Sequence, residues 1–310
     1  MFARPGLPSF DYVKASTPEE VIRLLDQHGN TAKLLMGGTD LFPALRDGIF
    51  RPQVVIDVKQ LPGMHDICFD TIEGLTIGAA VTMNELARHP DVRLHYPLLA
   101  EAASTVASYQ IRNRATVGGN LCNASPCADT SPAMLVLEAE LILYGPDGQR
   151  SVLAGEFFLG PGQTVLQTVE LLLAIRFPRL PADGWHSAAR YLKLGRCKSG
   201  DLALVGVAVL GLMPNSGYEG NSGCEFRIGL GSVAPTPLRA SEAERLLASG
   251  PPSREAFAHA AEKAMDAASP ITDVRGSAAY QKAMVQTLTF RGLADVWEQL
   301  QSHGPGQDLH

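Results

Sequence analysis

The stretch Lys33-Leu-Leu-Met-Gly-Gly-Thr-Asp40 is an apolar run that stops at two consecutive glycines, which a hydroxyl residue and a carboxylate follow. The run at residues 32–36 predicts a buried strand, and residues 41–46 predict a short helix for which Thr39 is a suitable N-cap. Glycine permits positive φ and lets a ligand approach the backbone, so that consecutive N–H groups can converge on an anion. The stretch therefore indicates either an anion or nucleotide site or a plain turn.

The stretch Ala115-Thr-Val-Gly-Gly-Asn120 repeats this arrangement farther along the chain. It belongs to a polar segment, residues 110–129, which is rich in Gly, Asn, Ser and Pro and which we expect to be irregular. Loops of that length inside a compact domain are commonly functional. Two such turns, one from each of two lobes, can hold a diphosphate from both sides. Neither is the G-x-G-x-x-G fingerprint of a Rossmann fold.

Short strands and helices alternate around these turns as far as an apolar strand at Leu171–Phe177, which Pro178 ends. Residues 181–184, with Pro, Asp and Gly, are typical of a linker. Farther on, two apolar stretches are strand-like, and the C-terminal part has apolar residues at helical spacing. The pattern predicts an α+β protein with a first domain at residues 1–180. Residues 181–310 then form a second domain, a small antiparallel sheet with a helical bundle.

Length and charge agree with this division and limit the function classes. The chain has 310 residues, more than a single hydrophobic core usually holds. Its net charge of −6 argues against nucleic-acid binding, which requires a clustered excess of Lys and Arg. No uncharged apolar stretch reaches the ~18 residues that a membrane span needs, and the start of the chain lacks a signal-peptide core.

The cysteines point to a reducing compartment. Their number, five, is odd, and their spacing is irregular, which does not suit a disulfide framework. We therefore expect a cytoplasmic protein without a membrane span. The cysteines are Cys68, Cys122, Cys127, Cys197 and Cys224.

Several further segments, together with the two glycine turns, resemble the FAD-binding (medium) subunits of the xanthine dehydrogenase and carbon monoxide dehydrogenase family of molybdenum hydroxylases. Each segment is weak evidence alone, but their order along the chain is specific, and the resemblance extends from about Phe10 to Leu300. The segments are 33–41, 111–132, 158–164 with Glu170, 191–193 followed by 201–203, 231–239 and 270–277.

The resemblance implies a fold and a cofactor site. Residues 1–180 become a two-lobed FAD-binding domain of the PCMH type, and residues 181–310 a C-terminal domain as in carbon monoxide dehydrogenase flavoproteins. The implied FAD contacts are Lys33, Leu34, Leu35, Met36, Gly37, Gly38, Thr39, Asp40, Ala115, Thr116, Gly118, Gly119, Asn120, Asp129, Leu171 and Lys193.

Individual roles follow from the same resemblance. Both turns hold the diphosphate and neighbouring groups, while Asp129 binds a polar group of the cofactor. Leu171 and Lys193 lie near the isoalloxazine, where a cation stabilises the anionic reduced flavin. The alternative for Lys193 is a solvated surface lysine. Asp40 has two possible roles. It is either a stabilising negative charge in the first turn of a helix or an acceptor for a ligand hydroxyl.

This chain departs from the family pattern at two positions. Met36 stands where a smaller residue is usual, so packing around the cofactor can differ. Cys127 stands where Ala is common, and four residues separate it from Cys122 in a Cys-x4-Cys spacing. An iron–sulfur cluster needs four ligands, and no further cysteines have suitable spacing. We therefore expect no metal on this chain.

The implied function is electron transfer. FAD is held without a covalent bond, because neither turn carries a His or Cys placed for attachment. A large partner subunit carries the molybdenum cofactor, and a small partner carries 2Fe–2S clusters that pass electrons to the FAD, which delivers them to an external acceptor. No catalytic residue for the organic substrate is expected on this chain.

Two other functions stay open at this point. One is a self-contained flavin oxidoreductase of the wider superfamily, similar to enolpyruvoyl-glucosamine reductases or vanillyl-alcohol oxidases. It would need acid and base residues over the flavin. The other is a non-enzymatic nucleotide-binding module, which would be colourless when purified.

Overall fold

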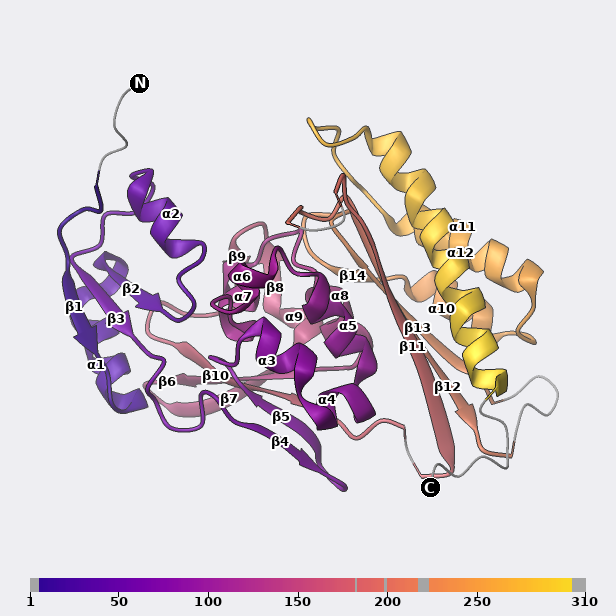
Figure 1. Cartoon of the computed structure of the whole chain (residues 1–310), viewed down its shortest axis with the longest axis horizontal. Helices are drawn as coiled ribbons and strands as arrows, with labels where there is room; N and C mark the ends of the chain where they lie inside the picture. Colours follow the sequence, from indigo (N-terminus) through magenta and orange to yellow (C-terminus); the bar gives the residue numbers. More distant parts are fainter. Residues whose placement is uncertain (1–5, 182, 198–199, 217–222, 303–310) are drawn as a thin grey trace.

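The computed structural model describes residues 6–181, 183–197, 200–216 and 223–302, and it is a mixed helix-and-sheet protein. Figure 1 shows three units in a row: a small N-terminal lobe, a central lobe, and a C-terminal sheet with helices on its outer face. The α+β fold class is confirmed.

The first lobe is a three-stranded parallel sheet in the order β1 (Asp11–Lys14), β3 (Val54–Asp57) and β2 (Ala32–Leu35). Helix α1 (Pro18–His28) precedes the short 3₁₀ turn η1 (Gly29–Thr31), and α2 (Leu41–Arg46) follows β2. Thr17 caps α1, since its side chain accepts the Glu20 N–H, and Pro18 takes the first turn, where no N–H is needed.

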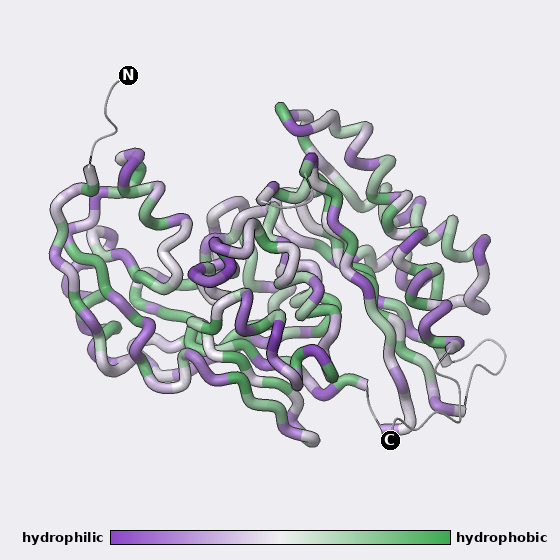
Figure 2. Tube along the Cα trace, viewed as in Figure 1, coloured by the Kyte–Doolittle hydropathy of each residue, from purple (hydrophilic) through white to green (hydrophobic). Residues whose placement is uncertain are grey.

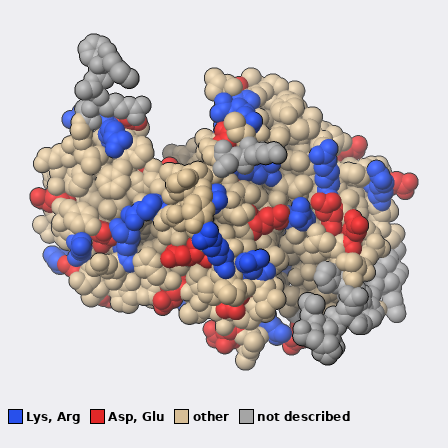
Figure 3. Space-filling view, in the orientation of Figure 1, with Lys and Arg blue, Asp and Glu red and all other residues tan. Residues whose placement is uncertain are grey.

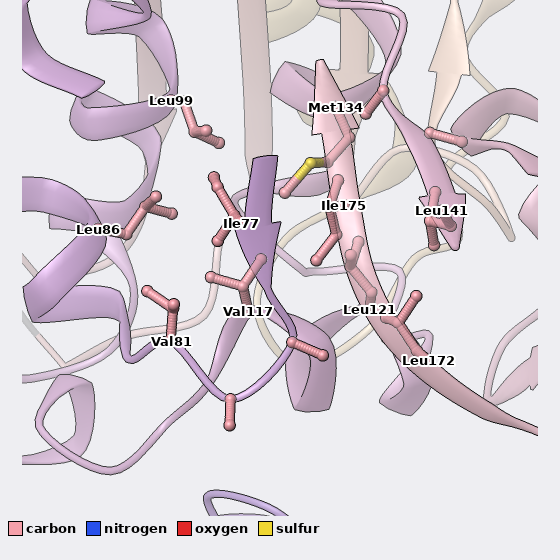
Figure 4. Packing of buried hydrophobic residues seen from close by; sticks show 14 of the residues in the cluster. Ile77, Val81, Leu86, Leu99, Val117, Leu121, Met134, Leu141, Leu172 and Ile175 are labelled. Carbon is pink, nitrogen blue, oxygen red and sulfur yellow. The ribbon is translucent and has the colours of Figure 1, made fainter. Parts of the chain in front are cut away.

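The second lobe contains a five-stranded antiparallel sheet in the order β4-β5-β10-β6-β7. Helices α3 to α8 cover it, and Figure 4 shows Leu86 and Leu99 of these helices pointing toward Ile77 of β5. Its elements are β4 (Ile67–Asp70), β5 (Gly74–Gly78), α3 (Met83–Arg88), α4 (Pro90–His95), α5 (Pro97–Thr105), α6 (Tyr109–Arg112), α7 (Val117–Asn123), α8 (Ser131–Val136), β6 (Glu140–Gly145), β7 (Gly148–Leu153), α9 (Ala154–Phe157), β8 (Phe158–Gly160), β9 (Gln163–Thr164) and β10 (Leu171–Phe177).

The C-terminal unit is a four-stranded antiparallel sheet in the order β11-β12-β13-β14 with a helical layer on one face. Strand β12 is buried on both faces: Ala208, Leu210 and Leu212 join the core of the second lobe, while Val207 and Val209 pack under the helices. The elements are β11 (Trp185–Leu194), β12 (Val205–Pro214), β13 (Glu225–Gly231), β14 (Leu238–Arg239), α10 (Ser241–Ala248), α11 (Arg254–Ala267) and α12 (Ala278–Ser302).

Hydropathy and charge follow this layering. In Figure 2 apolar residues gather along the strands of the second lobe, whereas the C-terminal helices alternate apolar and polar turns. Figure 3 shows basic and acidic side chains interspersed on the face in view. Among the described residues, no helix combines the length and the apolar character required to cross a bilayer.

Two predictions of local structure were wrong. Residues 110–129 are not irregular throughout, because they contain part of α6 and all of α7. Ser108 and Thr116 each accept a backbone N–H three residues later, and these caps start short helices that composition does not reveal. Thr39 does not cap α2 either: Asp40 is the N-cap residue, and no side chain bonds to the first turn.

Candidate functional site

A cavity of about 580 Å³ lies where the two glycine turns meet, between the first and second lobes. This volume is typical of small-molecule sites. Most residues of the predicted set line it, but Leu35, Gly118, Asp129 and Lys193 do not. The predicted residues along the cavity wall are Lys33, Leu34, Met36, Gly37, Gly38, Thr39, Asp40, Ala115, Thr116, Gly119, Asn120 and Leu171.

The first turn leaves successive backbone donors without an acceptor. The N–H groups of Gly37, Gly38, Thr39 and Asp40 make no hydrogen bond to any described residue. Gly37, Gly38 and Thr39 are half-exposed and Asp40 is exposed, so these N–H groups bind water unless a ligand takes its place. Successive N–H groups on one turn form a concave anion site. This turn therefore fits a diphosphate.

The second turn is different, because its donors are already used. Val117 and Gly118 donate their N–H groups to the carbonyls of Val81 and Ala79, each at 2.9 Å. Gly119 donates to the Thr116 hydroxyl at 3.1 Å, and Asn120 donates to the Thr116 carbonyl at 3.0 Å. The backbone of this turn therefore forms a wall of the cavity, while the first turn supplies the free donors.

The two glycines of each pair are glycine for different physical reasons. A Cβ on Gly37 would lie 2.2 Å from the Arg114 carbonyl oxygen, and one on Gly118 would lie 2.7 Å from the Ala79 carbonyl oxygen. Both glycines are therefore required where two segments of backbone touch. Gly38 has a φ of +75°, which favours glycine, whereas a Cβ on Gly119 would meet only the Thr116 hydroxyl at 2.8 Å.

One polar side chain of the second turn remains available to a ligand. The Asn120 carbonyl oxygen accepts the Thr130 hydroxyl at 2.7 Å. The two N–H bonds of the same amide have no acceptor among the described residues, and Asn120 lines the cavity.

A buried carboxylate holds the part of the wall that precedes β10. Arg150 donates to both oxygens of Glu170, at 2.7 and 2.8 Å, and to the Val165 carbonyl at 3.1 Å. The Gln167 N–H also bonds to Glu170, at 2.8 Å. The Arg150 guanidinium lowers the pKa of the Glu170 carboxyl, so this carboxylate stays charged and fixes the loop.

Asp129 and Lys193 form an ion pair away from the cavity, where the second lobe meets β11. The Lys193 ammonium donates to Asp129 at 2.7 Å and to the Thr105 carbonyl at 2.9 Å. The Tyr191 hydroxyl donates to the other Asp129 oxygen at 3.0 Å. The Lys193 side chain is 13% exposed, so it is not a solvated surface lysine. Burial raises the pKa of the Asp129 carboxyl, and the lysine opposes that shift.

Neither departure from the family pattern creates a metal site in the described residues. Met36 lines the cavity, and its sulfur accepts the Thr116 hydroxyl at 3.9 Å. Burial raises the pKa of the Cys122 thiol to about 12, while the Cys127 sulfur accepts from Arg275 at 3.0 Å. The described residues contain no cluster of His, Cys, Asp and Glu side chains that could hold a metal ion.

Other wall residues were not among the cofactor contacts that the sequence predicted. Ala44, Ile49 and Phe50 come from α2 and the loop after it, and Gly162 and Leu166 come from the β9 region. Each reaches the cavity through the tertiary fold. Glu170 was part of the resemblance but was not assigned to the site.

The family described as "FAD binding domain in molybdopterin dehydrogenase" matches residues 8–180. The chain belongs to this family of FAD-binding domains. A second family, "CO dehydrogenase flavoprotein C-terminal domain", matches residues 190–296. Together these matches identify a flavoprotein subunit of an oxidoreductase, with an FAD-binding domain followed by a C-terminal domain.

Alignments with similar proteins cover nearly the whole of this FAD-binding chain. The carbon monoxide dehydrogenase medium chain of Hydrogenophaga pseudoflava is 38% identical over 293 residues, which cover 94% of this chain and 98% of the relative. The xanthine dehydrogenase FAD-binding subunit of Escherichia coli O157:H7 is 31% identical over 285 residues, covering 92% and 95%.

Solved structures agree with these relatives. Carbon monoxide dehydrogenase from Hydrogenophaga pseudoflava, in a form that lacks the Mo-pyranopterin moiety, superposes with a TM-score of 0.87 at 36% identity, covering 96% of this chain and 100% of that one. Quinoline 2-oxidoreductase from Pseudomonas putida 86 superposes with a TM-score of 0.84 at 28% identity, covering 96% and 99%. The family resemblance is thus confirmed, and neither alternative function gains support.

Proposed function

We propose that this chain holds one FAD without a covalent bond and acts as the electron-transfer subunit of a molybdenum hydroxylase complex. The observation that carries the proposal is the row of unpaired N–H groups from Gly37 to Asp40 at a cavity of suitable size. The chain that contains these groups also aligns over nearly its whole length with a carbon monoxide dehydrogenase medium chain and a xanthine dehydrogenase FAD-binding subunit.

In this proposal the first turn binds the diphosphate through its backbone, and Thr39 adds a hydroxyl donor. The Asn120 amide faces the same ligand from the second turn, and Asp40 accepts a hydrogen bond from a ligand hydroxyl, because a carboxylate beside a diphosphate would otherwise be repelled. The apolar wall of the cavity is formed or backed by the apolar residues of the predicted set, Leu34, Leu35, Met36, Ala115 and Leu171. The Asp129–Lys193 pair holds the segment that faces the flavin end.

Three charged residues are among the described lining residues of the cavity, and no ion pair joins them to one another. They are Lys33, Asp40 and Glu170, and Glu170 is already bound to Arg150. A self-contained oxidoreductase would require free groups placed to move a proton. When bound, FAD supplies a group that takes up electrons singly and releases them in pairs. The chain itself binds, orients and shields that group.

The proposal extends to partners, domains and location. A large subunit with the molybdenum cofactor and a small subunit with 2Fe–2S clusters act on the substrate and deliver electrons. Residues 1–180 form the FAD-binding domain, and residues 181–310 the C-terminal domain. All five cysteines are free thiols, which supports a reducing, cytoplasmic location.

Acid precipitation of the purified protein tests the central claim. We expect a yellow protein with one FAD per chain, and we expect acid to release all of the colour into the supernatant, where its absorbance quantifies the flavin. A colourless protein that binds no added FAD would refute the function, and colour that stays in the pellet would refute non-covalent binding.

A further inference from the structure

One wall of the cavity contains an aromatic residue that the glycine turns do not explain. Of the described residues that line the cavity, Phe50 alone is aromatic, and Ile49 lies beside it in the chain. Phe50 is 39% exposed and Ile49 is 69% exposed. Large apolar side chains exposed together at a cavity are typical of ligand contact.

The backbone fixes these residues next to the cavity. After α2 the chain turns back at Gly48, whose φ is +74°. The N–H groups of Ile49 and Phe50 then both donate to the Ala44 carbonyl, at 2.9 and 3.4 Å. The segment is therefore tied to α2, and Phe50 is a preorganised part of the wall.

Lys33 of β2 contacts the Phe50 ring. Its ammonium nitrogen lies 4.6 Å from the centroid of the Phe50 ring, within the range of a cation–π contact. Lys33 also lines the cavity. The ammonium lies over one face of the ring, and nucleobases of any kind stack on the faces of aromatic side chains.

The proposed diphosphate turn gives a reference point for the two rings of a dinucleotide. The flat groups of FAD lie on opposite sides of its diphosphate. The proposed function puts the flavin end on the side of the Asp129–Lys193 pair, which includes a residue of β11. Phe50 follows α2 in the first lobe, and Figure 1 shows α2 and β11 on opposite sides of the second lobe's short helices. We infer that Phe50, with Lys33 and Ile49, forms the stacking site for the adenine ring and makes the cleft select FAD over FMN. This inference rests on the proposed function.

Ligand truncation combined with mutation tests the assignment. The flavin-free chain and its Phe50→Ala variant are titrated with FAD, FMN and ADP. Flavin fluorescence follows the first two, and calorimetry follows ADP. Stacking on an aromatic residue contributes ~1–3 kcal/mol per base, so Phe50→Ala should weaken FAD and ADP binding about 10-fold or more. FMN affinity should be unchanged, because FMN lacks the adenylate.

The controls separate stacking from damage to the fold. Phe50→Trp keeps an aromatic face and should keep FAD affinity. Ile72→Ala removes an apolar residue that is 83% exposed near β4 and should change no affinity. Equal weakening of FMN and FAD by Phe50→Ala would overturn the adenine assignment, as would unchanged ADP affinity, and the ADP result decides where FMN binds too weakly to measure. A wild-type chain that binds none of the three would refute the proposed function itself.

Discussion

Gly118 and Gly119 are neighbours in sequence, but different physical constraints require glycine at the two positions. A Cβ on Gly118 would meet the backbone of Ala79, which cannot move without disturbing β5 and the turn after it. A Cβ on Gly119 would meet only the Thr116 hydroxyl, and Gly119 lines the cavity. One glycine therefore serves the packing of the chain, and the other leaves room for a ligand.

Substitution by valine should separate these roles. Gly118→Val should lower the free energy of unfolding by about 3 kcal/mol or prevent folding, as overpacking of backbone contacts does. Gly119→Val should lower it by only about 1 kcal/mol, since the Thr116 cap is disturbed, yet should lose most of its FAD. Urea unfolding and the ratio of flavin to protein absorbance measure the two effects.

Gly250→Val is the matched control, because nothing lies within 4 Å of a Cβ at that position and its φ is not positive. It should keep both stability and flavin. A Gly119→Val protein with a full complement of FAD would show that this glycine does not face the cofactor.

At the scale of elements, β11 is attached to the second lobe by charged groups. Lys193 and Tyr191 bond to Asp129, and the Tyr191 N–H donates to Glu101 of α5 at 2.8 Å. Removing one partner of a buried ion pair leaves an uncompensated charge. The stability of this junction must therefore depend on the protonation of Asp129.

Lys193→Met should lower the free energy of unfolding by about 3 kcal/mol at pH 8. Burial already raises the pKa of Asp129, and loss of the ammonium removes the group that opposes this shift. The folded variant then binds a proton more tightly than the unfolded chain, so its stability must rise as the pH falls. Urea unfolding at pH 5 and pH 8 measures the difference.

The double variant Lys193→Met/Asp129→Asn removes the titrating group and should lose this pH dependence. If Lys193→Met were equally destabilised at both pH values, or if the double variant kept the dependence, Asp129 would not be the group responsible.

Elements with strong local signals could be predicted from sequence. The strand Leu171–Phe177 and the helix Leu41–Arg46 have the predicted bounds, because an apolar run ends at Pro178 and a glycine turn precedes Leu41. Strand β11 was missed: its polar positions include Arg190 and Lys193, which pair with carboxylates that lie far away in sequence.

The same distinction applies to the site. The glycine turns could be recognised, because close approach and positive φ restrict the residue type to glycine. Phe50 and Leu166 could not, since only the folding of α2 and of the loop before β10 brings them to the cavity. The sequence also did not show that the donors of the second turn are used within the protein.

At the scale of the whole molecule, the C-terminal sheet shares its core with the second lobe. Residues of β12 contribute to both hydrophobic clusters, and Tyr191 of β11 belongs to the cluster of the second lobe. The sheet is thus packed firmly against the lobe that contributes one wall of the cleft. A rigid flavoprotein of this kind suits electron relay, because the distance between the flavin and a partner's cluster stays fixed.

The relay function makes a prediction about the chain alone. Glu170 of the described cavity wall is bound to Arg150, and the described residues contain no cluster of side chains that could hold a metal ion. The isolated flavoprotein should therefore oxidise no purine, aldehyde or N-heterocycle, although NADH or a dye can still exchange electrons with it. Co-expression with molybdenum and iron–sulfur subunits should give a complex that survives gel filtration, since obligate interfaces commonly bury more than ~2,000 Å². Metal analysis and substrate turnover of each fraction decide the matter. A monodisperse flavoprotein without iron or molybdenum that turns over substrate at the full rate would overturn the relay, because the acid–base chemistry would then have to reside on this chain.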